Sequence, residues 1–390
     1  MSSVAFTNIE TLVTNVPELG TGLLGVKHGA TVVVENGYVA HIANRIPSGV
    51  DQEVDCSGKT LLPGFVDSHS HLIFAGDRSE EFSARSRGQR YSSGGIMGTV
   101  MATRKASDEF LTSNAHKFLN EALRTGTTTM EIKSGYGLSE YDELRSLAIA
   151  TSFTTETTLL AAHVIPPEFT SNPDDYVNLI INSIIPQSSA KWIDVFCDQG
   201  AFNSEQTEKI LAAGISAGAQ ARVHANQLTS GDGVEIAVKL GAASADHLAK
   251  STQHDIELLA SSQTVATLLP AAEFSTDLER ELGRKFLDSG AKVAIATDCN
   301  PGSSFTTSMP FCIAVAVSLL GFTVEEAVKA ATLGGAQALK RDDIGQIQVG
   351  SSADFALLET PSYIHLAYRP GVNIVQSTYK SGREITSWQK

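Results

Sequence analysis

The sequence has 390 residues, of which 42% are hydrophobic and 18% are charged. This composition is typical of a globular protein, and the length fits one barrel of roughly 250 residues with a smaller unit attached. The net charge of −14 argues against nucleic acid or an anionic membrane as a partner, and an anionic ligand would need local positive charge at its site.

Short β-branched segments near both ends of the chain are typical of strands. They are Thr31–Glu35, Tyr38–Ile42, Ser352–Leu358 and Asn373–Tyr379. The Asn36-Gly37 pair predicts a two-residue hairpin turn between the first two segments. Neither end is long enough to bury a core of its own. We therefore expect residues 1–60 and 345–390 to form one composite β-sandwich domain.

The middle of the chain alternates short apolar runs with longer helical stretches, which favours repeated βα units and a parallel sheet. Eight apolar runs occur, at Leu61–Val66, Thr127–Ile132, Thr158–Ala162, Lys191–Phe196, Ala221–Val223, Ala242–Ala245, Thr264–Leu269 and Lys292–Thr297. Helical patterns include Glu140–Phe153, Gln206–Ala217, Leu278–Ser289 and Val324–Leu339. Eight units predict an α/β fold in which residues 61–344 form a closed (β/α)8 TIM-like barrel. An open doubly wound sheet is the alternative, but no glycine fingerprint follows the first run.

Polar residues that could take part in catalysis or metal binding follow these runs. His69 and His71 follow the first run, and His163, His224 and His247 follow the third, fifth and sixth, so five of the ten histidines lie at run ends. The carboxyl ends of barrel strands converge on one face, where barrel active sites form. We therefore expect these side chains to meet.

His69 and His71 are two residues apart, and alternate residues of a strand face the same way. An HxH pair alone is also common as ordinary polar residues at a strand end. His224, and Asp298 after the eighth run, add a third nitrogen and a carboxylate. Together the four residues predict a site for one Zn or Fe ion with a position left for water.

A second set of residues could hold a small anion at the same face. Arg78 offers a fork for a carboxylate, while Tyr91, Tyr136 and His163 offer neutral donors. Each has an ordinary alternative, as a solvated loop arginine, a packing tyrosine or a hydrogen-bonded core histidine. Their common location favours the binding role.

The four cysteines, Cys56, Cys197, Cys299 and Cys312, match neither a paired metal motif nor a disulfide framework. We expect free thiols, with Cys299 packing beside the metal site. The N-terminal segment lacks the features of a signal peptide, and no apolar run reaches the roughly 20 residues of a membrane span. We therefore expect a cytoplasmic protein without a membrane partner.

Several motifs of the sequence resemble those of known protein families. The segment Leu62-Pro-Gly-Phe-Val-Asp-Ser-His-Ser-His resembles the first-strand motif of the amidohydrolase superfamily, which includes deaminases, hydantoinases and dihydroorotases. More specific segments resemble the imidazolonepropionase family over residues 30–355. These segments begin at Ser93-Gly-Gly-Ile, Ala102-Thr-Arg-Lys, Glu131-Ile-Lys-Ser-Gly-Tyr-Gly, Asp194-Val-Phe-Cys, Ser244-Ala-Asp-His and Ala296-Thr-Asp-Cys-Asn-Pro-Gly-Ser. One departure is Asn226, where the family usually has Asp.

The resemblance implies roles for individual residues. It places His69, His71, His224 and Asp298 as ligands of a single Zn or Fe ion, and assigns the catalytic water to His247, with Asp298 and Gln227 beside it. Around the substrate it places Arg78, Tyr91, Tyr136, His163, Gln227, Asn300, Gly302 and Ser303. It further implies a homodimer.

The reaction implied is hydrolytic ring opening of a small anionic cyclic amide, 4-imidazolone-5-propanoate, to N-formimidoyl-L-glutamate in histidine degradation. The proton of the attacking water could pass to His247 or to Asp298, and we predict His247, whose reference pKa of about 6.5 suits proton transfer. Another cyclic amidohydrolase or aminohydrolase is one alternative. A barrel that has lost its chemistry is another, but all four candidate metal ligands are present.

Overall fold

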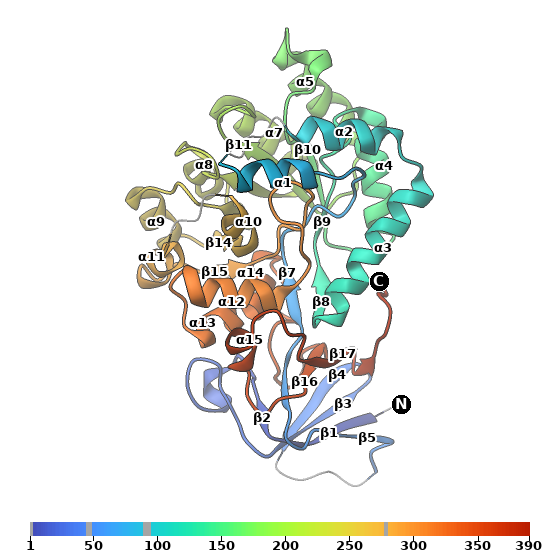
Figure 1. The fold of residues 1–390 in the computed structure, drawn as a ribbon, viewed down its shortest axis with the longest axis vertical. Helices are drawn as coiled ribbons and strands as arrows, with labels where there is room; N and C mark the ends of the chain where they lie inside the picture. Colours follow the sequence, from blue (N-terminus) through green and yellow to red (C-terminus); the bar gives the residue numbers. More distant parts are fainter. Residues whose placement is uncertain (1–2, 44–48, 89–94, 277–279) are drawn as a thin grey trace.

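A barrel forms the larger part of the molecule. The computed structural model describes residues 3–43, 49–88, 95–276 and 280–390 (Figure 1). The barrel strands are β7 (Phe65–Asp67), β8 (Thr127–Met130), β9 (Ile132–Lys133), β10 (Thr157–Ala162), β11 (Trp192–Cys197), β12 (Gln220–Ala225), β13 (Ser244–His247), β14 (Val265–Leu268) and β15 (Val293–Ile295). β9 to β15 form a seven-stranded sheet in chain order, and β7 pairs with β8.

Backbone hydrogen bonds between the segments that follow β7 and β15 close the parallel strands into a barrel. The backbone N–H of Asp298 donates to the carbonyl of His69 at 3.0 Å, and that of His71 donates to the carbonyl of Cys299 at 3.0 Å. Eight strand positions therefore surround one axis, which confirms the expected TIM-like barrel. The closing contacts also bring the first and eighth runs together at the end of the barrel that carries the histidines.

Two of the predicted runs are divided. Residues 60–63 form β6, which belongs to a separate sheet, and only β7 continues into the barrel, so the prediction of Leu61–Val66 as one barrel strand was wrong. The second run is interrupted at Glu131, whose backbone N–H donates to the carbonyl of Asp67 at 2.9 Å. Apolar residues lie on both sides of each break, and apolar character alone does not reveal which sheet a residue joins.

Helices surround the barrel, and α1 and α2 cross over one end of it (Figure 1). They are α1 (Ser79–Ser86), α2 (Ile96–Lys105), α3 (Asp108–Arg124), α4 (Glu140–Thr151), α5 (Pro173–Leu179), α6 (Ile185–Gln187), α7 (Ser204–Ser216), α8 (Gly233–Lys239), α9 (Gln253–Ala260), α10 (Pro270–Ser275), α11 (Leu282–Asp288), α12 (Met309–Leu319), α13 (Val324–Lys329), α14 (Gly335–Ala338) and α15 (His365–Tyr368). Single turns are η1 (Pro17–Leu19) and η3 (Pro167–Phe169), and π-helical segments are η4 (Ile180–Ile184) and η5 (Ala330–Gly334). The four predicted helical stretches correspond to α4, α7, α11 and the run from α13 to α14, although the stretch predicted from Leu278 begins outside the described residues.

Local capping residues define several helix starts. Asn203 before α7, Thr252 before α9 and Thr323 before α13 each accept a hydrogen bond from the third helical residue, which returns a side-chain hydrogen bond. Such capping boxes satisfy backbone N–H groups that the first helical turn leaves without partners. The strand-to-helix turns of the barrel are thus encoded locally.

Two small sheets lie at the opposite end from α1 (Figure 1). One contains β1 (Ser3–Ile9), β3 (Ala30–Glu35), β4 (Tyr38–Ala43) and β5 (Gln52–Asp55) in the order β4-β3-β1-β5. The other contains β2 (Thr11–Leu12), β6 (Thr60–Pro63), β16 (Phe355–Leu358), β17 (Val375–Lys380) and β18 (Arg383–Glu384) in the order β18-β17-β16-β6-β2. The predicted hairpin between β3 and β4 is confirmed, with positive φ at Asn36 (53°) and Gly37 (87°).

The two ends of the chain meet in these sheets, as expected. β16 pairs antiparallel with β6, and Phe6 of the first sheet packs edge-on against Phe355 of the second, with ring centroids 5.3 Å apart. These rings belong to a buried apolar cluster that also contains Leu61 and Tyr379.

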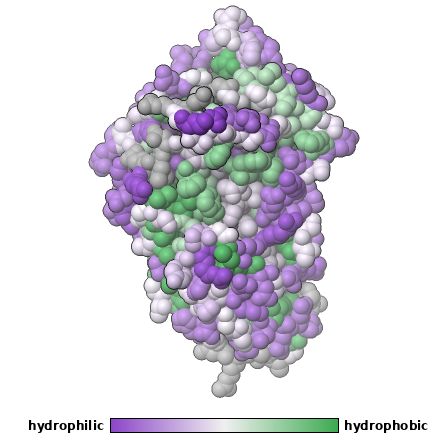
Figure 2. Space-filling model, in the orientation of Figure 1, coloured by the Kyte–Doolittle hydropathy of each residue, from purple (hydrophilic) through white to green (hydrophobic). Residues whose placement is uncertain are grey.

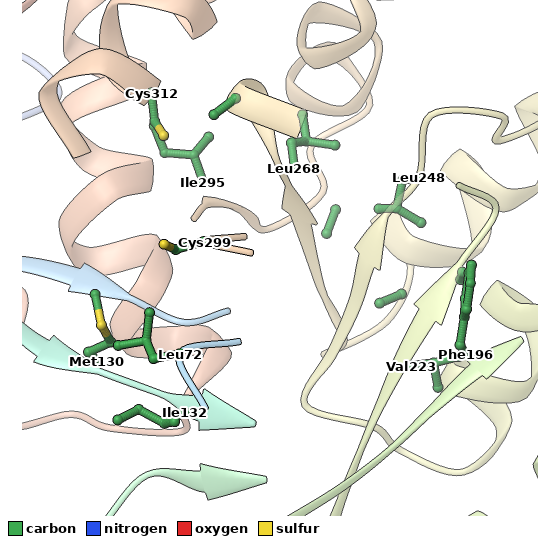
Figure 3. Close-up of a cluster of buried hydrophobic side chains, with 14 of the residues drawn as sticks. Leu72, Met130, Ile132, Phe196, Val223, Leu248, Leu268, Ile295, Cys299 and Cys312 are labelled. Carbon is green, nitrogen blue, oxygen red and sulfur yellow. The ribbon is translucent and has the colours of Figure 1, made fainter. Parts of the chain in front are cut away.

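The largest apolar cluster lies in the barrel and against its helices. Figure 3 shows part of this cluster, with Met130, Ile132, Val223, Leu268 and Ile295 on different barrel strands. This continuous packing holds the strand ends in fixed relative positions. In the face seen in Figure 2, hydrophilic residues cover α1 and more hydrophobic area lies below it. No helix among the described residues combines the length and apolarity needed to cross a membrane.

Candidate metal centre and active site

Four buried side chains converge at the carboxyl end of the barrel, as predicted. His69 and His71 follow β7, His224 lies on β12 and Asp298 follows β15. The Nε2 atom of His71 lies 3.2 Å from that of His69 and 3.4 Å from that of His224. The Oδ1 atom of Asp298 lies 3.3 Å from His71 Nε2 and 3.5 Å from His69 Nε2.

These separations fit a metal ion. Ligand atoms about 2.0–2.1 Å from a tetrahedral zinc ion lie roughly 3.3 Å from one another. Burial lowers the pKa of His69 and of His71 well below the usual value, which keeps both rings in the neutral form that binds metals. Three imidazole nitrogens and one carboxylate oxygen are therefore close enough together to hold one divalent ion.

A buried carboxylate orients His69 from behind. Asp246 Oδ2 lies 2.7 Å from Nδ1 of His69 and accepts a hydrogen bond from Arg222 Nη2 at 3.2 Å. Arg222 is itself fully buried and also donates to the carbonyl of Ser68 at 2.7 Å. A partner on Nδ1 fixes the ring so that Nε2 faces the ligand cluster.

His224 has a similar arrangement. Its Nδ1 lies 3.0 Å from Asp194 Oδ2, which also accepts a hydrogen bond from Lys133 Nζ at 2.9 Å. Burial alone would raise the pKa of Asp194, but His224 and Lys133 hold that pKa well below its usual range. Lys133 also donates to Glu131 at 2.9 Å. Because these charges are buried and paired, removing one of them would leave another without its partner.

His247, at the end of β13, lies beside the ligand cluster. Its ring centroid is 5.2 Å from that of His224 and 5.5 Å from that of His69. Burial lowers the pKa of His247 to about 3, so the ring is neutral at neutral pH, and the expectation that its pKa stays near the reference value was wrong. His247 (φ 78°) and Asp298 (φ 52°) both have left-handed backbone conformations, which are strained for these residues and recur at functional sites.

A small cavity lies over the cluster. It is lined by His71, Arg78, Ile96, Tyr136, His163, Phe196, His224, Gln227, His247, Asp298, Asn300 and Ser303. Most of the residues predicted from the sequence therefore share one chamber. His69 and Gly302 do not line it, and Tyr91 lies outside the described residues.

Arg78 brings positive charge to this chamber. It precedes α1, and its side chain is 7% exposed. Its Nε donates to Glu81 Oε2 at 2.8 Å and its Nη2 to Glu81 Oε1 at 2.7 Å. The guanidinium is therefore held in a fixed orientation at the cavity wall.

Tyr136 and His163 line another part of the cavity. Nδ1 of His163 lies 2.9 Å from the carbonyl of Gly135, and burial lowers the pKa of His163 well below its usual value. Its ring stacks on that of His71 with centroids 5.5 Å apart. Tyr136 is buried, with its ring centroid 5.4 Å from that of His163. Both are placed to act as uncharged hydrogen-bonding groups.

The loop after Asp298 mainly orients its own residues. Asn300 Oδ1 accepts from the backbone N–H groups of Gly302 and Ser303, each at 2.8 Å. Ser303 Oγ lies 3.2 Å from Asp298 Oδ2 and so fixes the second oxygen of this candidate ligand. Cys299 in this loop is buried, and burial raises the pKa of its thiol well above the usual value, in line with a packing role.

Asp198 fixes the loop that carries Gln227. Its carboxylate accepts from the backbone N–H groups of Leu228 at 2.8 Å and Thr229 at 3.1 Å, and from Thr229 Oγ1 at 2.6 Å.

All four cysteines are free and buried.

The sequence interpretation missed Asp194, Asp246, Lys133 and Arg222 as partners of the ligand histidines. A signal was available, because charged residues inside apolar strand runs are buried and need partners. It also missed Phe196, which forms an apolar wall of the cavity.

The barrel and its candidate mononuclear metal centre define a hydrolase of the metal-dependent barrel class. The chain belongs to the amidohydrolase family, whose model matches residues 60–385, and within that family to the imidazolonepropionases. It is 54% identical to an imidazolonepropionase from Mycolicibacterium smegmatis, with 100% of this chain and 98% of the relative covered. The imidazolonepropionase from Streptomyces griseus is 51% identical, with 99% and 100% covered.

Solved structures show the same fold at much lower sequence identity. Atrazine chlorohydrolase from Arthrobacter aurescens TC1, complexed with zinc, matches with a TM-score of 0.74 at 16% identity, covering 99% of this chain and 95% of that chain. An adenosine deaminase from Xanthomonas campestris with bound zinc matches with a TM-score of 0.71 at 18% identity, covering 98% and 92%.

Proposed function

We propose that the protein hydrolyses 4-imidazolone-5-propanoate to N-formimidoyl-L-glutamate, using one Zn or Fe ion held by His69, His71, His224 and Asp298. The observation that carries the proposal is the convergence of this ligand set beside a cavity that Arg78 lines together with three of the four ligands. The identity of 54% to an imidazolonepropionase over the whole chain supports the same substrate.

The bound ion would supply Lewis acidity, polarising a carbonyl oxygen and lowering the pKa of water. The protein supplies the remaining groups. Arg78 binds the propanoate and Tyr136 donates to the substrate. The neutral ring of His163 uses its Nδ1–H for the carbonyl of Gly135, so its Nε2 accepts a hydrogen bond from the substrate. Gln227 orients the attacking water through its amide, which cannot act as a base.

Hydrolysis joins the water oxygen to the carbonyl carbon and breaks the bond between that carbon and the ring nitrogen. We assign the proton released by the water to a ring nitrogen of His247, which returns a proton to the departing ring nitrogen. Asp298 is the other candidate acceptor, but its Oδ1 faces His69 and His71 and its Oδ2 contacts Ser303. Ser303 and Asn300 hold Asp298 in place.

The direct test is turnover of 4-imidazolone-5-propanoate by the purified protein, followed by loss of imidazolone absorbance and by chemical identification of the product. Metal analysis of the same sample decides between zinc and iron. A substrate panel containing cyclic amidines tests the alternative of an aminohydrolase. Turnover of an amidine but not of the imidazolone would contradict the proposal.

Arg78→Lys tests the carboxylate contact. A planar fork is poorly replaced by the point charge of lysine, so kcat/KM for the propanoate substrate should fall by roughly 10-fold or more. A ring analogue without the carboxylate should react poorly with both enzymes, and Arg78→Lys should change that reaction little. Equal losses on both substrates would mean that Arg78 supports the fold.

We further propose that residues 1–60 and 345–390 form a composite β-sandwich domain attached to a barrel domain, and that the protein is a cytoplasmic homodimer. The packing of Phe6 on Phe355 supports the composite domain. The imidazolonepropionase resemblance favours the dimer, which light scattering of the purified protein would test.

A further inference from the structure

Arg78 does not stand alone at the cavity wall. Both oxygens of Glu81 accept hydrogen bonds from it, in a fork made by Nε and Nη2. This fork occupies one edge of the planar guanidinium and sets the direction of the other edge. Glu81 lies one turn into α1, and its side chain is 30% exposed.

A second arginine connects the fork to the metal side of the cavity. Arg85 Nη1 donates to Glu81 Oε1 at 3.2 Å, and Arg85 Nη2 donates to the carbonyl of Gly302 at 2.9 Å. Gly302 belongs to the loop that follows Asp298. Glu81 therefore sits between two guanidinium groups, and the group of three carries one net positive charge.

Two glycines form a slot for the Arg78 side chain. A Cβ atom at Gly302 would lie 2.2 Å from Arg78 Nη1. A Cβ atom at Gly95 would lie 2.2 Å from Arg78 Nη2 and 2.2 Å from Glu81 Oε2. Gly95 has φ −66° and ψ −20°, which any residue adopts. Glycine is needed there because a side chain would clash with Arg78 and Glu81.

We propose that Glu81 is a positioning residue for recognition of the substrate carboxylate, which it performs by fixing the guanidinium plane of Arg78, with Arg85 tying this arrangement to the loop after Asp298. This inference rests on the proposed function, because it takes the substrate to be a carboxylate. A pre-oriented fork loses less freedom when it binds a planar anion, which favours both affinity and correct placement. Arg85 offsets the negative charge that Glu81 brings near the anion.

Glu81 has a second physically reasonable role, with the opposite effect on substrate affinity. A carboxylate on Arg78 could compete with the substrate carboxylate for the same guanidinium. The two roles predict opposite changes when Glu81 loses its charge, so one variant separates them.

The test compares Glu81→Gln with Glu80→Gln, which removes the same charge from an exposed neighbour on the same helix. Three quantities are measured for each: kcat and KM for the imidazolone, the dissociation constant of unreactive 3-(imidazol-4-yl)propanoate by calorimetry, and the unfolding temperature. We expect Glu81→Gln to raise KM and the dissociation constant by roughly 10-fold with a smaller change in kcat, and Glu80→Gln to change neither. A lower or unchanged KM in Glu81→Gln would overturn the proposal.

Two further variants guard against a merely structural effect. Gly95→Ala should reproduce the loss of affinity, because the added methyl displaces Arg78 without altering any charge. In the Arg78→Lys background, Glu81→Gln should add little further loss, whereas an additive loss would show that Glu81 acts independently of Arg78. If the wild-type protein failed to turn over the imidazolone, the proposed function would fall, and the dissociation constants would still decide the role of Glu81.

Discussion

His224 illustrates how a single side chain is placed for metal binding. Its Nε2 faces His71 at 3.4 Å while its Nδ1 lies 3.0 Å from Asp194. The ring therefore cannot turn without losing one of these contacts. Such carboxylate–histidine pairs both orient the ring and raise its basicity as a ligand.

Replacing His224 with alanine should remove the metal ion and abolish turnover, because one of three imidazole ligands is lost. The barrel should still fold, since its apolar core is untouched. Metal content by mass spectrometry and folding by circular dichroism check both statements, with the exposed His254→Ala as the control. Full activity of His224→Ala in metal-free buffer would refute the metal site.

Substitution of His247 should affect the chemical step much more than it affects ligand binding. We expect His247→Asn to keep the metal and to bind 3-(imidazol-4-yl)propanoate within several-fold of the wild type. Turnover should fall by about 10²–10⁴ in kcat, the range for a lost general acid or base. Steady-state kinetics and calorimetry measure the two effects. A loss confined to KM would leave His247 as a binding group only.

At the scale of elements, the loop after β9 shows how a helix positions a site residue. Glu143 of α4 is buried and accepts from the backbone N–H groups of Gly135 at 3.0 Å, Gly137 at 2.8 Å and Leu138 at 2.7 Å. Arg104 of α2 donates to the carbonyls of Gly137 at 2.6 Å and Leu138 at 2.9 Å. Tyr136 is thus held in the cavity by contacts on both sides of its loop.

Glu143→Gln should loosen this loop, because an amide nitrogen would then face at least one backbone N–H. We expect a cost of about 1–3 kcal/mol in the free energy of unfolding for the donor left without a partner. Displacement of Tyr136 should also lower kcat/KM by roughly 10-fold. Urea unfolding and kinetics measure both, and the wild-type protein is the reference. A change in stability with unaltered kinetics would mean that the loop position does not matter for turnover.

At the scale of the whole molecule, the chain passes directly from a small sheet into the barrel. β6 ends at Pro63, and the N–H of Gly64 donates to the carbonyl of Asp354 at 2.9 Å. The next N–H, of Phe65, donates to the carbonyl of Gly126 at 2.9 Å in the barrel. The first barrel strand, which leads to His69, is therefore attached to residues from both ends of the chain.

Phe355→Ala tests this attachment. Phe355 is fully buried, and truncating a buried phenylalanine costs about 3–5 kcal/mol in the free energy of unfolding. The exposed Phe274→Ala should change it by less than about 0.5 kcal/mol. If the small sheets and the barrel fold as one unit, Phe355→Ala should shift a single unfolding transition monitored by barrel and terminal fluorescence labels. Separate transitions would show that the terminal strands fold independently.

The sequence by itself predicted the barrel and the four candidate metal ligands that meet at one end of it. Alternate residues of a strand share a face, so His69 and His71 could be assigned to one ion, and His224 and Asp298 followed because barrel strands end on one face. The tertiary structure decided which residues stand behind these ligands. Asp194 contacts His224 from the neighbouring strand, and Asp246 contacts His69 from a strand distant in the sequence. Arg85, which contacts Glu81 on the same helix, reaches the loop after Asp298 only in the folded chain. It also decided how residues 60–67 divide between two sheets, since the choice depends on hydrogen bonds to strands far away in the sequence.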